Sequence, residues 1–199
     1  MHTEIEVKFL DIDVAELRQR LKQHGAQLVQ PERTLRRRNF DFSQTRHDAW
    51  VRVRDEANKI TITYKKTQDT TVHGTHEINL EVDNFEAACE FMNAIGLKEK
   101  SEKETRRESW LLDEVQIEID TWPWIPSFVE LEGNSVDDLR HVAQKLDFSW
   151  ESHLAGDVTG VYRLHYKFDV HDLYNKPIVF GPTPSWLKPR NADAAEATR

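Results

Sequence analysis

Six short stretches of the sequence alternate between apolar and polar side chains, and this alternation constrains the fold more than any other feature. In "TEIEVKF", residues 3–9, the apolar side chains fall on one face, while Glu4, Glu6 and Lys8 fall on the other, because side chains of a β-strand alternate between two faces. The pattern recurs in "WVRVRD" (50–55), "KITITYK" (59–65), "EINLEV" (77–82), "VQIEID" (115–120) and "FVELE" (128–132). The chain therefore predicts a sheet with one hydrophobic face and one charged face.

Amphipathic helices are predicted between some of these strands. Apolar residues recur at helical spacing over 13–24, 84–95 and 136–147, with cap residues at their ends. Eight strands are predicted, several of them joined by turns so short that antiparallel pairing follows: 3–9, 35–42, 50–55, 59–65, 76–82, 105–112, 115–120 and 127–132.

The charges on the polar faces sort by strand. Arg52 and Arg54 take both inner polar positions of their strand, whereas Glu130 and Glu132 take those of theirs. A solvated outer face is the plain alternative, but helices that cover the apolar face from outside would turn the charges inward. An eight-stranded antiparallel sheet can close on itself. We therefore predict an α+β fold, a closed eight-stranded antiparallel β-barrel with helices packed outside and a charged lumen.

Composition narrows the class of protein. The 199 residues carry a net charge of −8, which argues against a general nucleic-acid binder. Residues 33–66 nevertheless hold ten Lys or Arg against four Asp or Glu. No apolar run is long enough for a membrane span, no signal peptide is evident, and Cys89 is the one cysteine, so a cytoplasmic protein is expected.

The ordered set of motifs resembles the CYTH superfamily, the triphosphate tunnel metalloenzymes. "EIEVK" (4–8) matches the ExExK signature of these proteins, and the match continues through "RVR" (52–54), "TYK" (63–65), "LEVDNFE" (80–86), "RRESW" (106–110), "IEID" (117–120) and "FVELEG" (128–133). We assign residues 1–166 to this domain and residues 167–199 to a C-terminal extension that is Pro-rich and then polar, where it is expected to fray.

The resemblance implies a site for a triphosphate and Mg²⁺ or Mn²⁺. Hard cations prefer oxygen ligands, and the implied metal-binding carboxylates are Glu4, Glu6, Asp120, Glu130 and Glu132. The implied substrate-binding cations are Lys8, Arg52, Arg54, Lys65 and Arg107. Lys8, Glu81 and Arg107 are the implied catalytic residues, with Glu81 helping to hold water or a second metal. Crowding by arginines is expected to lower the pKa of Lys8.

Some positions depart from the family pattern. Asn79 stands where relatives often carry a basic residue, and Thr105 stands where a Lys is common, with Lys103 as a substitute. In "RRRNFDF" (36–42), Arg36 and Arg38 share one strand face. The sequence leaves open whether one of this pair reaches the lumen or both are solvated.

The leading hypothesis is metal-dependent hydrolysis of a triphosphate, with tripolyphosphate, ATP or thiamine triphosphate as the substrate. The alternative is a class IV-type adenylyl cyclase that converts ATP to cyclic AMP and pyrophosphate. A third hypothesis is a non-catalytic binder of polyphosphate or nucleotide. No nucleic-acid or membrane partner is expected, and a homodimer is left open.

Overall fold

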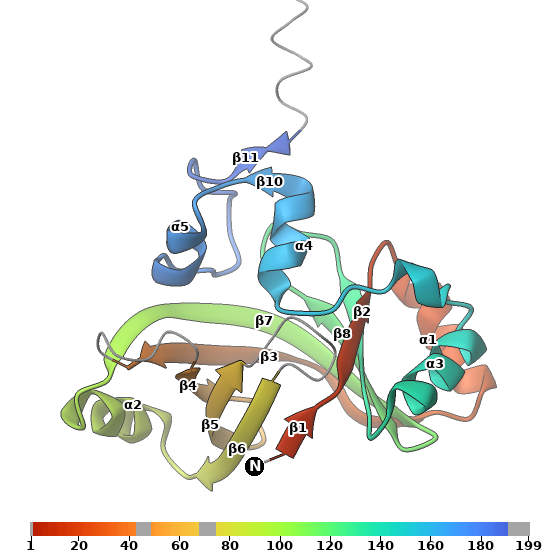
Figure 1. Cartoon of the computed structure of the whole chain (residues 1–199), viewed down its shortest axis with the longest axis horizontal. Helices are drawn as coiled ribbons and strands as arrows, with labels where there is room; N and C mark the ends of the chain where they lie inside the picture. The colour runs from red at the N-terminus through yellow and green to blue at the C-terminus, as the bar shows by residue number, and fades with distance from the viewer. Residues whose placement is uncertain (1, 43–48, 68–74, 191–199) are drawn as a thin grey trace, which may run out of the picture.

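The computed structural model describes residues 2–42, 49–67 and 75–190, without the side chains of residues 2–4, 67 and 75. Its main element is one strongly curled antiparallel sheet (Figure 1). The strand order is β1-β6-β5-β4-β3-β7-β8-β9-β2. The bounds are β1 His2–Glu4, β2 Glu6–Phe9, β3 Gln27–Asp41, β4 Ala49–Asp55, β5 Ile60–Thr67, β6 Thr75–Val82, β7 Lys98–Leu112, β8 Val115–Thr121 and β9 Phe128–Glu132. All eight predicted strands are present, the first of them divided in two.

The N-terminal segment pairs with strands at both ends of the sheet. β1 pairs with β6, whereas β2, one residue further on, pairs with β9. The other edge of β2 is occupied by Leu154, which exchanges two backbone hydrogen bonds with Lys8, of 2.8 and 2.9 Å. The expected closed barrel is thus only partly confirmed. The sheet is antiparallel and strongly curled, but it is a half-barrel that does not close, and a loop residue rather than another strand covers the edge of β2 at Lys8.

Strands β3 and β7 extend much further than their apolar alternation predicted. They pair with each other from Gln27↔Leu111 to Asp41↔Lys98, and one of the register shifts, between Gln30 and Arg33, includes Pro31. Bulges of this kind let a strand accept a proline, which cannot donate to the ladder. The added part of β7, "KEKSEKE" (98–104), has no apolar face to signal a strand. These two long strands form the centre of the sheet.

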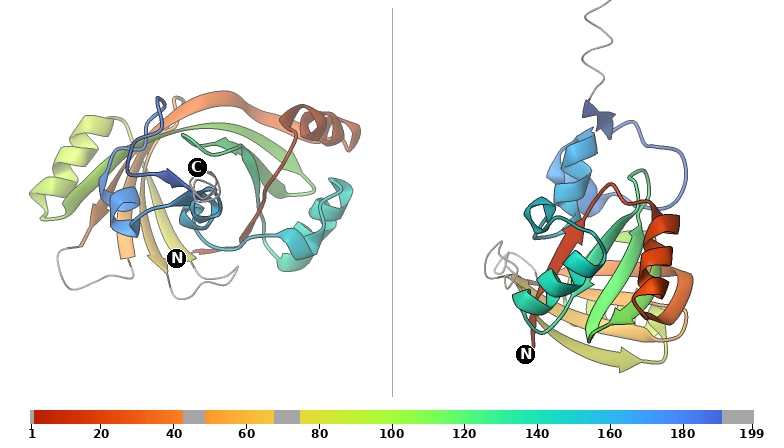
Figure 2. Two further views of the ribbon diagram at one scale, coloured as in Figure 1. Left: turned by 90° about the horizontal axis from the view of Figure 1, so that it is seen from above. Right: turned by 90° about the vertical axis from the view of Figure 1, so that its right-hand side faces the viewer.

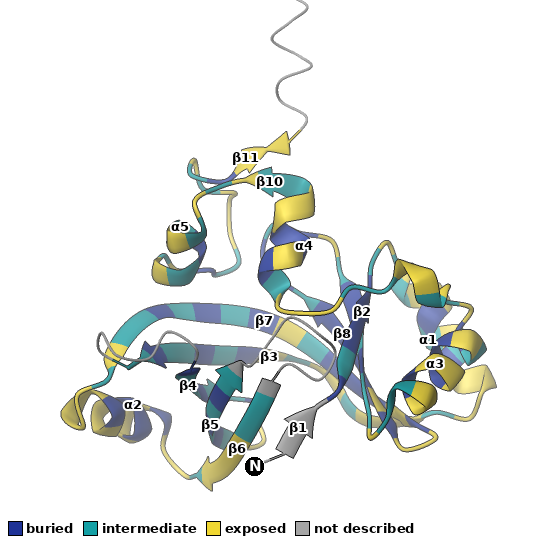
Figure 3. Cartoon of the chain, in the orientation of Figure 1, coloured by how far each residue is buried: buried dark blue, intermediate teal, exposed yellow. Residues whose placement is uncertain are grey.

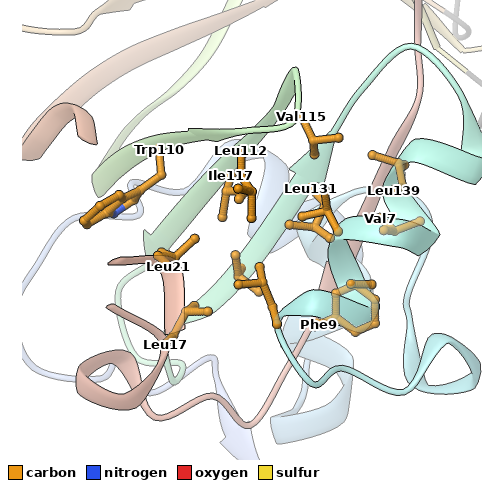
Figure 4. Close-up of a cluster of buried hydrophobic side chains, with 14 of the residues drawn as sticks. Val7, Phe9, Leu17, Leu21, Trp110, Leu112, Val115, Ile117, Leu131 and Leu139 are labelled. Atoms are coloured by element: carbon orange, nitrogen blue, oxygen red, sulfur yellow. The ribbon is translucent and has the colours of Figure 1, made fainter. Parts of the chain in front are cut away.

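Helices α1 (Val14–Gln23), α2 (Phe85–Ala94) and α3 (Val136–Lys145) agree with the predicted ranges and lie outside the curled sheet. α1 and α3 pack on the apolar face of β2, β7, β8 and β9 (Figure 4), where Leu21, Ile117 and Leu139 are fully buried. α2 covers a second cluster with Phe40 and Val53. The apolar face of the sheet is therefore covered from outside, and buried residues alternate along the strands (Figure 3).

The C-terminal segment, by which we mean residues 156–190, packs on the sheet over one end of the curl (Figure 2). It contains α4 (Val158–His165), α5 (Val170–Asn175) and the small pair β10 (Tyr166–Lys167) and β11 (Lys188–Pro189). Ile178 is fully buried, and its backbone bonds to Glu102 and Glu104 of β7 at 3.1 and 2.8 Å. The sequence did not decide where residues 167–190 pack. The tail expected to fray, 191–199, lies outside the described residues.

Within the described ranges, none of the helices is long and apolar enough to cross a bilayer.

The buried contact of the C-terminal segment leads to a stability prediction. Replacing Ile178→Ala should lower the free energy of unfolding by about 2–5 kcal/mol, because it leaves a cavity among buried side chains. Leu164→Ala is the matched control, since Leu164 on α4 is 52% exposed and should change stability by less than about 0.5 kcal/mol. Urea unfolding of both variants measures the difference, and equal stabilities would contradict this packing.

Candidate functional site

A cavity of about 1090 Å³ lies within the curled sheet, and the charged faces of its strands line it. Ten of the predicted site residues lie on its wall: Glu6, Lys8, Arg52, Arg54, Lys65, Glu81, Arg107, Asp120, Glu130 and Glu132. The side chain of Glu4, the eleventh, lies outside the described residues. The alternation and the family resemblance therefore predicted side chains that share this cavity, while the role of each remains a prediction.

The carboxylates are concentrated on three neighbouring strands. Glu6 of β2 faces Glu132 of β9 directly across the ladder, and Glu130 of β9 faces Glu118 of β8. Like charges in directly opposed positions destabilise a sheet. This wall therefore contains two unfavourable acidic pairs that only neighbouring cations or a ligand can offset.

Lys8 neutralises part of the negative charge on this acidic wall. Its ammonium group is 2% exposed, pairs with Glu6, lies 3.2 Å from Glu130 Oε1 and donates to the Gly156 carbonyl at 2.7 Å. Burial alone lowers the pKa of Lys8, but the Glu130 and Glu6 carboxylates outweigh burial and raise it above its ordinary value. The expected lowering was wrong, because the nearest charges are these acids and not the arginines.

Arg107 neutralises another part of the negative charge on this wall. Its guanidinium donates to both Asp120 oxygens, at 2.6 and 2.5 Å, and to Glu130 Oε2 at 2.7 Å. Burial by itself would raise the pKa of Glu130, but Lys8 and Arg107 lower it to about 2. Glu130 thus links the two cations and is ionised at any ordinary pH.

The opposite wall, on β4, β5 and β6, holds a hydrogen-bonded network. Arg52 donates to Thr63 at 3.4 Å, Thr63 donates to Asn79 at 2.7 Å, and Asn79 donates to Glu77 at 2.8 Å. Lys65 lies 3.3 Å from the other oxygen of Glu77. Asn79, where relatives often carry a basic residue, here connects a hydroxyl to a carboxylate, and so orders the network without adding charge.

Glu81 lies on β6 but away from the acidic wall. It is solvent-exposed, lines the cavity, and faces Thr61 of β5. Thr61 in turn faces Arg54, whose guanidinium pairs with the buried carboxylate of Glu56. Burial raises the pKa of Glu56, but Arg54 and Lys59 outweigh it and lower the value. Sequence reasoning missed Glu56, which sits in a predicted turn.

Arg37, and not Arg36 or Arg38, reaches the cavity. It is 6% exposed, donates to Thr105 Oγ1 at 2.6 Å, and lies over the Trp122 ring at 4.7 Å. Arg36 and Arg38 contact Glu86 and Phe85 on the outer side. The open question about this same-face pair is thereby answered against the lumen, because Phe40 anchors their strand with its even-numbered face toward α2.

Two further parts of the wall were not fully anticipated. Lys103 does line the cavity, as the expected substitute for a Lys at Thr105. The C-terminal segment contributes a set of residues that no strand-like alternation could reveal: Gly156, Asp157, His171, Leu173, Tyr174 and Asn175. They come from helices and loops, so their position depends on tertiary packing.

The acidic wall fits a hard divalent cation by its chemistry. The side chains of this wall that could bind a metal do so through carboxylate oxygens, which are suitable ligands for Mg²⁺ and Mn²⁺. Among the described side chains, no three acids converge into a preformed metal cage. Mg²⁺ typically uses only one or two carboxylates and completes its shell with water and phosphate oxygens, so a pair such as Glu6 and Glu132 suffices.

The fold is a strongly curled antiparallel sheet whose inner face holds both acids and cations around one cavity. The CYTH domain model matches residues 2–156, and the chain belongs to this family. Members of the family are triphosphate-acting enzymes, generally dependent on divalent metal.

Solved structures show the same fold. PH1012 of Pyrococcus horikoshii is 24% identical with a TM-score of 0.64, over 75% of this chain and 93% of its own. A candidate adenylate cyclase of Vibrio parahaemolyticus is 14% identical with a TM-score of 0.68, over 81% and 98%. A Hippeastrum protein, a candidate adenylyl cyclase described as having a dominant triphosphatase activity, is 12% identical with a TM-score of 0.51, over 82% and 96%. No curated protein matches the chain.

Lys103 yields a prediction about pH. Burial, with help from Arg37 and Lys100 and against Asp157, lowers its pKa to about 8, while Tyr174 stacks near its ammonium at 5.8 Å. The unfolded chain keeps an ordinary value near 10.5, so between pH 8 and 10.5 the unfolded state binds more protons and stability rises with pH. Below pH 8 the burial penalty is present in full.

Replacing Lys103→Met should therefore stabilise the ligand-free protein at pH 7, by up to about 3 kcal/mol from the shift in pKa. The advantage should shrink as pH rises toward 10. Urea unfolding of both proteins at several pH values measures this difference, and a constant gap across the range would refute the assigned pKa.

Proposed function

We propose that the protein hydrolyses a triphosphate, inorganic or carried on a small organic group, with the help of Mg²⁺ or Mn²⁺. One observation carries the proposal: a single cavity contains directly opposed acids on one wall and directly opposed cations on the other. Each pair costs stability in the empty protein. A divalent cation bound together with a polyanion would offset both costs at once.

The acidic wall would hold the metal. Glu6, Glu130 and Glu132 lie on the adjacent strands β2 and β9, with Asp120 on β8, and Glu4 joins them by its place in the ExExK motif. When bound, the divalent cation would neutralise charge that develops on phosphate oxygens.

The cations would hold and orient the phosphates. Phosphoryl transfer depends mainly on positioning and on stabilising charge. Arg52, Arg54 and Lys65 project into the cavity from β4 and β5, and their donors suit phosphate oxygens. Lys8 and Arg107 already bond to the acids, so in this proposal they would contact phosphate oxygens close to the metal. Glu81 would orient the attacking water from the exposed end of β6.

The second candidate is cyclisation of ATP, with the ribose 3′-hydroxyl as nucleophile in place of water. The Vibrio protein, described as a candidate adenylate cyclase, favours this reading. The Hippeastrum protein, described as mainly a triphosphatase, favours hydrolysis. Both reactions would use the same metal and phosphate sites, so the products distinguish them.

A substrate panel tests the proposal. The full chain is incubated with Mg²⁺ or Mn²⁺ and tripolyphosphate, ATP or thiamine triphosphate, and the products are identified. Orthophosphate supports hydrolysis, whereas cyclic AMP with pyrophosphate supports the cyclase. A rise in melting temperature with tripolyphosphate, without turnover of any compound, supports a non-catalytic binder, because any ligand of the folded state stabilises it.

Glu132→Gln is the sharpest test of the metal site. Glu130 also bridges two buried cations, so its replacement would cost stability as well as activity. Glu132, partly exposed, should lose activity by about 10²-fold or more, as expected for a group that stabilises transition-state charge through the metal, while its melting temperature stays near that of the wild type.

Glu114→Gln is the matched control, since Glu114 is exposed in the turn between β7 and β8. It should retain full activity at every metal concentration. Saturation curves for Mn²⁺ read out the metal site directly, and an unchanged curve for Glu132→Gln would remove this residue from the metal site.

A further inference from the structure

Three cations lie side by side across the middle of the sheet. Arg54 of β4 faces Arg37 of β3, and Arg37 faces Lys103 of β7, all three in register and all on the cavity wall. We call this row the cation ladder. The row spans two strand spacings, a length of roughly 10 Å. It is separate from the hydrogen-bonded network of Arg52 and Lys65.

The ladder is costly in the empty protein. Directly opposed like charges repel, and Arg37 and Lys103 are only 6% and 5% exposed. Arg54 has Glu56 as a partner, but neither Arg37 nor Lys103 has an ion pair with a carboxylate of the described residues. Arg37 bonds to the Thr105 hydroxyl and lies over the Trp122 ring, and Lys103 lies near the Tyr174 ring.

The groups around these two cations add little negative charge. Arg37 lies over Trp122, and Lys103 is near the Tyr174 ring of α5. Lys100, also beside Tyr174, is already paired with Asp41 at 2.6 Å. Asp157 is the nearest acid to influence Lys103, yet burial and Arg37 outweigh it. Asp120 acts on Arg37 in the same way, yet burial and the neighbouring arginines outweigh it. Two buried cations that face a cavity without an ion pair among the described residues indicate an anionic ligand group there.

We propose that the cation ladder binds a fourth phosphate, so that the cavity accepts linear chains of four or more linked phosphates. The inference rests on the proposed function, because Arg54 belongs both to the triphosphate clamp and to the ladder. The remaining two members extend the clamp sideways, beneath the C-terminal segment. A cationic organic group would be repelled from this end, whereas an extended phosphate chain places one negative charge or more at each step.

The chain of phosphates could be inorganic or attached to a nucleoside, and the experiment separates the two. Dissociation constants are measured by calorimetry on the full chain, with EDTA present to prevent turnover. The four compounds are tripolyphosphate, tetrapolyphosphate, ATP and adenosine 5′-tetraphosphate. The wild type should bind the tetraphosphate of at least one pair about tenfold more tightly than the matching triphosphate, a difference of about 1.4 kcal/mol.

Arg37→Met and Lys103→Met should each bring that ratio close to one, and either variant suffices if the other fails to fold. Arg106→Met is the matched control, because Arg106 is exposed on the same strand and contacts Phe180 on the outer side. It should keep the wild-type ratio. A preference with the inorganic pair alone assigns the subsite to free polyphosphate, and one with the nucleotide pair alone assigns it to a nucleoside tetraphosphate.

The failures are distinguishable. If tripolyphosphate binds or is hydrolysed but the wild type shows no preference for four phosphates, the ladder proposal is overturned and the proposed function stands. If the preference persists in both folded variants, the fourth phosphate lies elsewhere. If none of the four compounds binds or turns over, the proposed function itself fails.

Discussion

The repulsion between like charges on neighbouring strands is the constraint on which the rest of the structure depends. An antiparallel ladder sets opposed residues about 5 Å apart, and this sheet opposes Glu6 to Glu132 and Arg54 to Arg37. On an open surface, water would screen such pairs. Inside a curled sheet, they must be offset by neighbours or by a ligand. The arrangement is therefore informative in a way that a solvated charged face is not.

The two walls solve this problem differently. On the acidic wall, Lys8 and Arg107 already neutralise much of the charge, through Glu130 and Asp120. Across the middle of the sheet, Arg37 and Lys103 carry buried charge, and neither forms an ion pair with a carboxylate in the part of the chain that the structure describes. The empty cavity should therefore attract an anion first at its cationic end. A divalent cation that binds the acids would then compete with Lys8 and Arg107 for the same oxygens, and would release their donors toward phosphate.

Much of this could be predicted from the sequence, because the fold repeats one rule. Strict alternation marks one polar face on each strand, and the helices predicted to cover the apolar face turn that polar face inward, so residues such as Lys65 and Glu130 were expected in the cavity. Where alternation is absent, prediction failed. The stretch at 98–104 has polar residues on both faces, and so gave no strand signal for the segment that carries Lys103.

The face of Arg37 illustrates a different limit. In a run of three arginines, composition cannot tell the inner face from the outer one, and only the register that Phe40 fixes decides it. Likewise, the contact of Leu154, a loop residue far along the chain, with the edge of β2 could not be expected from any strand pattern. Both features depend on contacts between distant segments, which local patterns do not encode.

The C-terminal segment strengthens the electrostatic attraction of these cations for an anion, because it shields them from solvent. Without α4 and α5, the row of Arg37 and Lys103 would face solvent, and an ion in water gains little from such a contact. Tyr174 and Leu173 line this end of the cavity, and two backbone hydrogen bonds join Ile178 to β7. The same cations therefore lie in a low-dielectric environment, where their attraction for an anion is several-fold stronger. The burial that destabilises the empty protein thus favours the bound state, so the packing of the segment and the affinity of the cavity for anions are coupled through one set of contacts.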